Sequence, residues 1–136
     1  MSHAKLWSYE RQLPAEAGSI PRARHFVGGL LVEHGMLDLV DDVHLVVSEL
    51  ATNAIRHANT PFTVTLEQVG QSLVLTVADG SPAPPVRLAA DLLNTGGRGL
   101  AIVESVSGGW GINPTRPGTG KSVWASFAIP AETPST

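Results

Sequence analysis

Apolar residues recur at helical spacing in two neighbouring stretches of the first half of the chain. The first stretch runs from Ser19, which we expect to be the N-cap with Pro21 in the first turn, to about Gly35. Its apolar positions are Phe26, Val27, Leu30 and Leu31. The second begins around Asp38, and its apolar stripe consists of Leu39, Val40, Val43, Val47, Leu50, Ala51 and Ala54. The pattern therefore predicts two successive amphipathic helices.

Polar residues of the second predicted helix lie to one side of this stripe: Asp42, Glu49, Asn53 and Arg56. Glu49 and Asn53 are four residues apart, which places a carboxylate and a carboxamide one turn from each other on the same face. Asn53 and the neighbouring Thr52 are both poor helix formers, so their presence suggests a binding function. The alternative is that this face is simply the water-exposed side of an amphipathic helix.

Alternation of apolar and polar residues predicts five strands, over residues 6–13, 62–69, 72–78, 110–113 and 121–129. We expect the first to be an edge strand, and the third to be central because it is apolar on nearly both faces. Trp110 and Trp124 are expected in the core. With a further helix from about Leu100 to Val106, this order predicts an α+β fold: a two-layer sandwich with helices on one face of a mostly antiparallel sheet.

Composition narrows the class of protein. The 136 residues fit one domain, 1–136, with no linker or repeat, and 43% hydrophobic residues suffice for a core. A net charge of -3 without a basic patch argues against a nucleic-acid partner. The absence of cysteine excludes disulfides and thiolate metal sites. No apolar run is long enough to span a membrane and the N-terminus lacks a signal-peptide core, so we expect a cytoplasmic protein.

Three polar segments are candidates for one ligand site. Besides Glu49 and Asn53, they are Asp79-Gly80 at the end of a strand and the glycine-rich residues 96–99 before a helix. An aspartate at a strand end can accept a hydrogen bond from a base amine, and a glycine-rich helix N-terminus offers N–H groups to phosphates. An asparagine oxygen suits Mg²⁺, and a nearby glutamate suits proton abstraction. Taken singly, the second segment also fits an ordinary turn and the third a connector.

Residues 118–122, Gly-Thr-Gly-Lys-Ser, superficially match the end of a P-loop. The P-loop motif requires a glycine five residues before its second one, and Thr115 stands there. The residues that follow have a strand pattern where the motif requires a helix. The P-loop interpretation is therefore rejected.

The order and spacing of the three segments resemble the GHKL (Bergerat-fold) ATP-binding family. Residues 49–57, ELATNAIRH, look like its N box; Asp79-Gly80 looks like its G1 box; and residues 97–100, GRGL, look like its G2 box. The similarity covers about residues 20–129, including the late PGTGKSVWASF. Within the family, the chain is most similar to stand-alone anti-sigma-factor serine/threonine kinases.

The resemblance implies an ATP and Mg²⁺ site with a role for each matching residue. Glu49 would be the general base and Asn53 would hold Mg²⁺, with His57 ending the N box; Asp79 and Gly80 would bind adenine, with Thr119 nearby. The lid over the phosphates would comprise Gly97, Arg98, Gly99 and Leu100.

The resemblance also implies protein partners. Such kinases sequester a sigma factor and phosphorylate a serine or threonine of an anti-anti-sigma antagonist, and Arg22 and Arg24 match the region where relatives contact partners. Relatives often form homodimers, for which the edge strand at residues 6–13 is available.

One departure keeps a second function open. Relatives often have a further glycine after the G1 aspartate, whereas Asp79-Gly80-Ser81 runs into Pro82, Pro84 and Pro85. The alternative to a kinase is therefore a nucleotide-gated module that binds a regulatory partner with little or no catalysis. A third, weaker possibility is an interaction domain that no longer binds nucleotide.

Overall fold

The computed structural model describes residues 5–80, 103–116 and 120–130, and the structural statements below concern these ranges. The elements in chain order are β1 (Lys5–Leu13), α1 (Ser19–Glu33), the 3₁₀ turn η1 (Leu37–Leu39), α2 (Val40–Ala58), β2 (Phe62–Val69), β3 (Ser72–Asp79), β4 (Gly109–Arg116) and β5 (Gly120–Ala128). Residues 103–106 are also helical, which is the described part of the helix expected from about Leu100.

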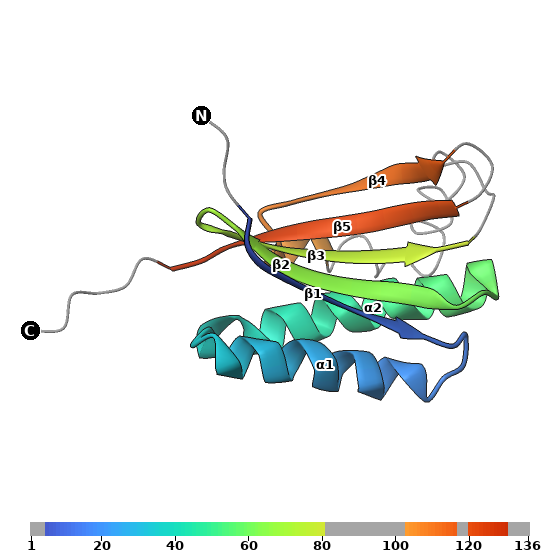
Figure 1. The fold of residues 1–136 in the computed structure, drawn as a ribbon, viewed down its shortest axis with the longest axis horizontal. Coiled ribbons are helices and arrows are strands. Elements are labelled where there is room, and N and C mark those ends of the chain that lie inside the picture. Colours follow the sequence, from blue (N-terminus) through green and yellow to red (C-terminus); the bar gives the residue numbers. More distant parts are fainter. Residues whose placement is uncertain (1–4, 81–102, 117–119, 131–136) are drawn as a thin grey trace, which may run out of the picture.

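The five strands form one sheet in the order β1-β2-β3-β5-β4, and every neighbouring pair is antiparallel. Both α1 and α2 cover the same face of this sheet (Figure 1). The predicted two-layer α+β sandwich is therefore confirmed. So are the edge position of β1 and the central position of β3, which pairs with β2 on one side and β5 on the other.

The core lies between the helices and the helix-facing side of the sheet. From η1 and α2 it receives the whole predicted stripe except Val40, and also Val46, which the prediction omitted. Val40, at the start of the helix, is only partly buried. The strands contribute alternate residues: Phe62, Val64, Leu66, Leu73, Leu75, Val77, Val123, Ala125 and Phe127. This period of two is what a strand needs to bury one face.

The prediction of Ser19 as N-cap is wrong. Gly18 occupies the N-cap position, and Ser19 is the first helical residue. The Ser19 side chain is fully buried, and its hydroxyl donates a 2.7 Å hydrogen bond to the carbonyl oxygen of Pro14. The hydroxyl therefore ties the helix back to the end of β1 and does not cap the helix.

The helix ends follow the local chemistry of the sequence. After α1, Gly35 has a φ of +73°, a backbone conformation that glycine adopts at low cost. After α2, Asn59 is left-handed with a φ of 52°, which asparagine tolerates better than most residues. These two residues let the chain reverse direction after each helix.

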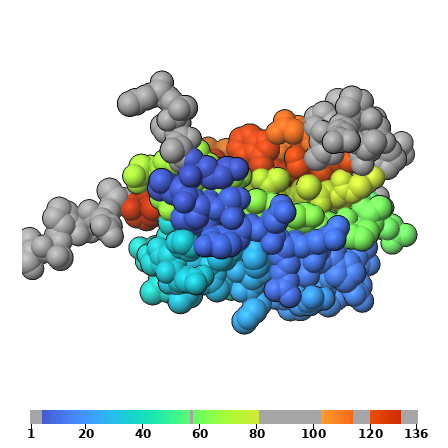
Figure 2. Space-filling model, in the orientation of Figure 1, coloured from blue at the N-terminus to red at the C-terminus, as the bar shows by residue number. Residues whose placement is uncertain are grey.

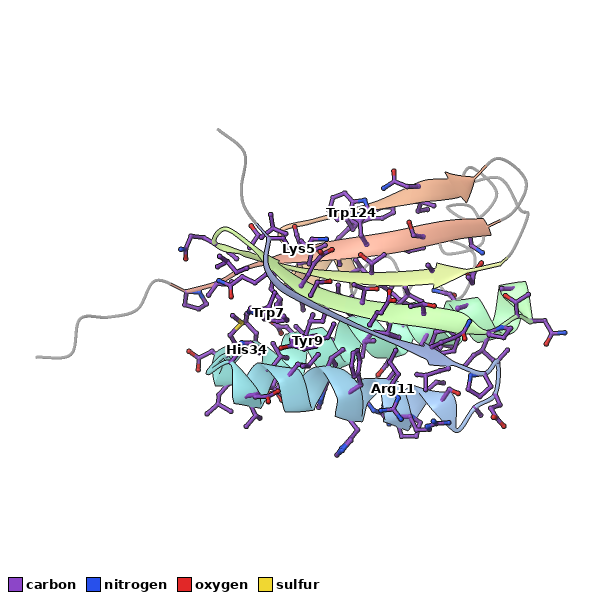
Figure 3. The ribbon with its side chains drawn as sticks, in the orientation of Figure 1. Lys5, Trp7, Tyr9, Arg11, His34 and Trp124 are labelled. Atoms are coloured by element: carbon purple, nitrogen blue, oxygen red, sulfur yellow. The ribbon has the colours of Figure 1, made fainter. Side chains whose placement is uncertain are left out.

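The two tryptophans expected in the core lie in different places. Trp110 is partly buried against the core. Trp124 instead lies on the sheet face away from the helices and is only half-buried, so its core assignment is wrong (Figure 3). It alternates with the buried Val123 and Ala125, and its indole lies over Gly111, where a Cβ would meet Nε1 at 2.6 Å. The single strand period explains this: a residue between two buried neighbours must face the other side.

An aromatic contact joins the edge strand β1 to the helix layer. The rings of Trp7 on β1 and His34 after α1 stack with centroids 4.0 Å apart (Figure 3). Trp7 Nε1 also donates a 2.9 Å hydrogen bond to Gln68 Oε1 on β2. In the described part of the chain, no helix has the length and apolarity needed to cross a membrane.

The two helices approach each other closely at Gly28. A Cβ at this position would lie 2.6 Å from Nε2 of His44 on α2, whereas a Cβ at Gly29 would meet nothing within 4 Å. Nε2 of His44 is buried and has no hydrogen-bond partner in the described structure. Gly28 therefore provides the space in which the His44 ring packs.

We predict that Gly29→Ala raises the free energy of unfolding by up to about 1 kcal/mol, because alanine is the better helix former. Gly28→Ala should gain less than this or destabilise the fold, because the His44 ring must move. Urea unfolding of both variants measures the difference. In a His44→Ala background the two glycine substitutions should become equivalent, and a persistent difference there would contradict the proposed contact.

Candidate functional site

A buried ion pair joins the end of β3 to the start of β5. Asp79 and Lys121 are direct register partners on these neighbouring strands. Lys121 Nζ lies 2.8 Å from Asp79 Oδ1, and the two side chains are 2% and 3% exposed, respectively. Lysine and aspartate are rarely buried this completely unless they are paired. The pair therefore places two opposite charges at the border of an apolar core.

This ion pair lines a cavity that also reaches α2. The cavity is formed by three elements, through Leu50, Asn53, Ala54, Val77, Asp79, Lys121 and Val123. Its volume of about 10 Å³ is about the least that a cavity needs to hold one water molecule. The C-terminal part of α2, the end of β3 and the start of β5 all lie at the same end of the molecule (Figure 1).

Asn53 belongs to this cavity and not to a water-exposed helix face. Its exposure is 8%, and its neighbours Leu50 and Ala54 are core residues. The alternative of a purely solvent-exposed polar face is therefore wrong for Asn53, although Asp42 and Glu49 are half-buried and Arg56 is exposed. The structure thus brings Asn53 and Asp79, 26 residues apart in the sequence, to one cavity.

Glu49 lies one turn before Asn53 on α2, half-buried, and is not among the residues that line the cavity. His57 lies in the last turns of α2, and its side chain lies outside the described part. The other polar side chains of this segment are occupied by the helix itself. Ser48 donates to the carbonyl oxygen of His44, and Thr52 donates to that of Ser48, at 2.7 and 2.6 Å. Thr52 therefore needs no binding function to explain its presence.

The strand end that carries Asp79 is held by the loop after α2. The Gly80 N–H donates a 3.0 Å hydrogen bond to Thr60 Oγ1. Thr60 directly follows the left-handed Asn59, so the turn that ends α2 also positions the residue after Asp79. A Cβ at Gly80 would lie 3.3 Å from Thr60 Oγ1, a tight contact. This arrangement connects the N-box and G1-like segments directly.

Five of the residues predicted from the resemblance lie outside the described residues: Gly97, Arg98, Gly99, Leu100 and Thr119. Their roles stay predictions. Residues 120–122 of the P-loop-like segment do lie within the described structure. They begin β5, which runs as a strand from Gly120 to Ala128. A P-loop would require a helix here, so its rejection is confirmed.

Lys121 is the site residue that the sequence analysis missed. On β5 its side chain has the same orientation as the buried Val123, Ala125 and Phe127, so it is a charge at an inward-facing position. A lysine in that register is a signal that alternation alone could have revealed, because an inward charge needs a partner. Its partner, Asp79, could be recognised only by knowing that β3 and β5 are neighbours.

The two arginines assigned to partner binding differ in their surroundings. Arg22 lines a groove of about 240 Å³ together with Arg11, Pro21 and His25. Arg11 extends from β1 over α1, and Figure 2 shows the surfaces of β1 and α1 side by side on one face (Figures 2 and 3). Arg24 instead donates a 3.2 Å hydrogen bond to Ser48 Oγ on α2. The groove therefore contains Arg22 but not Arg24.

The two-layer α+β fold thus carries a small cavity between α2, β3 and β5, lined by Asn53, Asp79 and Lys121. The sequence profile of the family described as the histidine kinase-like ATPase domain matches residues 13–126. The chain belongs to this family, which indicates an ATP-binding, ATPase-like regulatory function and ATP-dependent phosphotransfer in general. A search of curated proteins gives no significant match.

The residues that line the cavity are suited to the adenine end of ATP, whereas they do not form a metal site by themselves. Asp79 supplies a buried acceptor for a base amine, and the apolar Leu50, Ala54 and Val77 offer contacts to a ring. Among the described residues, no group of three or more His, Asp or Glu side chains could hold a metal ion. A Mg²⁺ would therefore depend on Asn53 together with phosphate oxygens and water, which is the usual mode for this ion.

We predict that Asp79→Ala lowers the free energy of unfolding by about 3–5 kcal/mol, because it leaves the buried Lys121 ammonium without its partner. Adding Lys121→Met should recover much of this loss, since no buried charge then remains. Chemical denaturation of both variants provides the measurement.

Lys5→Met is a matched control, because the Lys5–Glu67 pair has the same 2.8 Å separation with a lysine that is 59% exposed. That substitution should cost less than about 1 kcal/mol. Equal losses for Asp79→Ala and Lys5→Met would contradict the energetic importance of burial.

Proposed function

We propose that this protein is an ATP- and Mg²⁺-dependent serine/threonine protein kinase of the anti-sigma-factor type. The observation that carries the proposal is the convergence of Asn53 and Asp79 on one buried cavity. These residues belong to two segments whose sequence matches the N and G1 boxes. Membership of the ATPase family supports nucleotide binding, and the anti-sigma type rests on the resemblance of the motifs.

Each part of the proposed ATP site has a task. At the base end, Asp79 accepts a hydrogen bond from the adenine amino group, with Gly80 and Thr119 beside it. At the phosphate end, Asn53 holds Mg²⁺, and residues 97–100 with His57 belong to the surroundings of the phosphates. Bound Mg²⁺ would neutralise developing charge on the transferred phosphoryl group.

Glu49 is the proposed general base. It lies on the same helical face as Asn53, one turn toward the N-terminus of α2. A carboxylate there can accept the proton of an attacking serine or threonine hydroxyl. The half-buried position leaves Glu49 reachable from outside the cavity, as a protein substrate requires.

A second candidate function is a nucleotide-gated binding module with little catalysis. It is favoured by the position of Glu49, which does not line the cavity that contains Asn53. In this alternative, nucleotide binding controls the affinity for a regulatory protein and no phosphoryl transfer follows.

For the kinase, we expect Glu49→Ala to retain nucleotide affinity within about threefold and to lower phosphoryl transfer by about 10²–10⁴-fold, the usual contribution of a general base. Isothermal titration with ADP and Mg²⁺ measures the first quantity. Transfer of radiolabelled phosphate from ATP to candidate anti-anti-sigma proteins measures the second.

Glu33→Ala is a suitable control, because Glu33 is an exposed glutamate at the end of α1. Transfer by Glu49→Ala at the wild-type rate would rule out the base assignment. Nucleotide binding without transfer by the wild-type protein would favour the binding module.

The proposed partners are a sigma factor, which the protein sequesters, and an anti-anti-sigma antagonist, which it phosphorylates. The groove between β1 and α1 supports a partner contact because Arg11, Arg22 and His25 gather there. Such a cationic surface favours an acidic segment of the partner. The homodimer remains a further proposal, for which β1 offers an unpaired edge in the described sheet.

Arg22→Glu should therefore weaken sigma-factor binding at least about tenfold, because it reverses a charge in the groove. Arg24→Ala should have a smaller effect, because Arg24 is already bound to Ser48. Biolayer interferometry against a panel of sigma factors, with Lys5→Ala as the control, measures both. A larger loss for Arg24→Ala would place the contact on another face of α1.

A further inference from the structure

We propose that Lys121 is a specificity-determining residue for the base: it donates a hydrogen bond to a ring nitrogen of adenine beside the amino group that Asp79 binds. The inference rests on the proposed nucleotide site and adds a residue to which neither the family resemblance nor the family match assigns a role. The juxtaposition of a buried ammonium and a buried carboxylate in one cavity carries it.

The ammonium of Lys121 has more donors than Asp79 alone uses. An ammonium has three N–H donors, and among the described residues Asp79 is the acceptor found for Lys121 Nζ. The ammonium therefore has donors left for a ligand while it remains bound to Asp79.

Burial keeps bulk water away from the remaining donors of Lys121. An ammonium that is 2% exposed cannot satisfy its further donors with bulk water, and leaving them unmade is costly. Replacing a buried ion pair by apolar residues is often neutral or stabilising, so packing alone gives no reason for a charged pair here. A ligand that supplies an acceptor inside the cavity would satisfy these donors.

The Asp79–Lys121 pair is complementary to one chemical class of ligand. An acceptor next to a donor on the protein requires a donor next to an acceptor on the ligand. Adenine has this pattern: its exocyclic amine is flanked by the ring acceptors N1 and N7. Asp79 would receive the amine and Lys121 would donate to one of these nitrogens, so the pair discriminates against a base that lacks the flanking acceptor.

Entry of the adenine base into the cavity requires side chains to move. A cavity of about 10 Å³ has room for a water but not for a purine, so side chains at its border must move when a base enters. Lysine has a flexible four-carbon stem and rotatable donors, which allow the ammonium to shift while keeping a contact with Asp79. Lys121 thus fills the cavity beside Asp79 in the absence of nucleotide and binds the ring nitrogen in its presence.

The test compares ADP with 1-deaza-ADP and 7-deaza-ADP, in which N1 or N7 is replaced by C–H. Isothermal titration with Mg²⁺ is carried out on the wild-type protein and on Lys121→Met. The wild type should bind one of the two analogues about ten- to a hundredfold more weakly than ADP, as expected for a lost hydrogen bond to a charged donor. Lys121→Met should bind that analogue and ADP with equal affinity.

A purely structural role for Lys121 predicts a different pattern. If the lysine only clamps β3 to β5, Lys121→Met weakens all three nucleotides by the same factor and the discrimination persists, which overturns the proposal. Lys121→Arg, which keeps the charge, should retain discrimination, and Lys5→Met should behave as the wild type. If Lys121→Met does not fold, equal wild-type affinity for all three nucleotides still overturns the proposal.

Failure of the proposed function itself gives a distinct result. If the wild-type protein binds neither ADP nor either analogue at millimolar concentration, the nucleotide site is absent and both inferences fail together. If it binds ADP without discriminating between the analogues, the nucleotide site stands and the role of Lys121 alone is rejected.

Discussion

The packing of α2 across the central strands of the sheet is the constraint on which the candidate site depends. The apolar stripe of α2 fixes the rotation of the helix, because Leu50 and Ala54 must face the core. Asn53 lies between these two in sequence and is about 100° from Ala54 around the helix axis, so the same rotation carries its carboxamide to the border of the core. The position of a polar group is thus set by apolar neighbours.

The sheet likewise places charged groups at the border of the core. Val77 and Val123 are buried at helix-facing positions, and the next residues in the same register, Asp79 and Lys121, are charged. The sheet therefore changes from apolar to charged within one strand period at the end of the core. Two buried charges are tolerated there because they are paired, and their mutual attraction offsets part of the cost of desolvating them.

The sequence predicts most of this fold because its elements have clear periodicities. The stripe of α2 and the alternation of β2 and β3 give both the type of element and the face that is buried. What it could not give were features that depend on tertiary neighbours. The hydroxyl of Ser19, for example, bonds to Pro14 rather than capping its own helix. Trp124 is a different case, because alternation with the inward-facing Val123 and Ala125 already predicts that it faces outward.

The candidate site, too, could be predicted from the sequence only in part. Asn53 and Asp79 could be predicted as members of one site because their segments resemble known motifs, whereas local sequence alone left each with an ordinary explanation. Lys121 lies in the late segment that resembles the family, but the resemblance gives it no role, and its one local signal is a charge in an inward register. Its importance follows from strand order, since β5 inserts beside β3 although 40 residues separate Asp79 from Gly120 in the numbering.

The base end and the phosphate end of the proposed site are built differently, which bears on the choice between kinase and binding module. The adenine end consists of the Asp79–Lys121 pair, which is held by two paired strands of the sheet. Glu49, the proposed general base, does not line this cavity. Its proposed contact is with the hydroxyl of the protein substrate and not with the nucleotide. A chain of this kind can therefore lose phosphoryl transfer without losing the nucleotide. Base recognition is the property that both functions share, and it rests on the part of the site that the sheet holds in place.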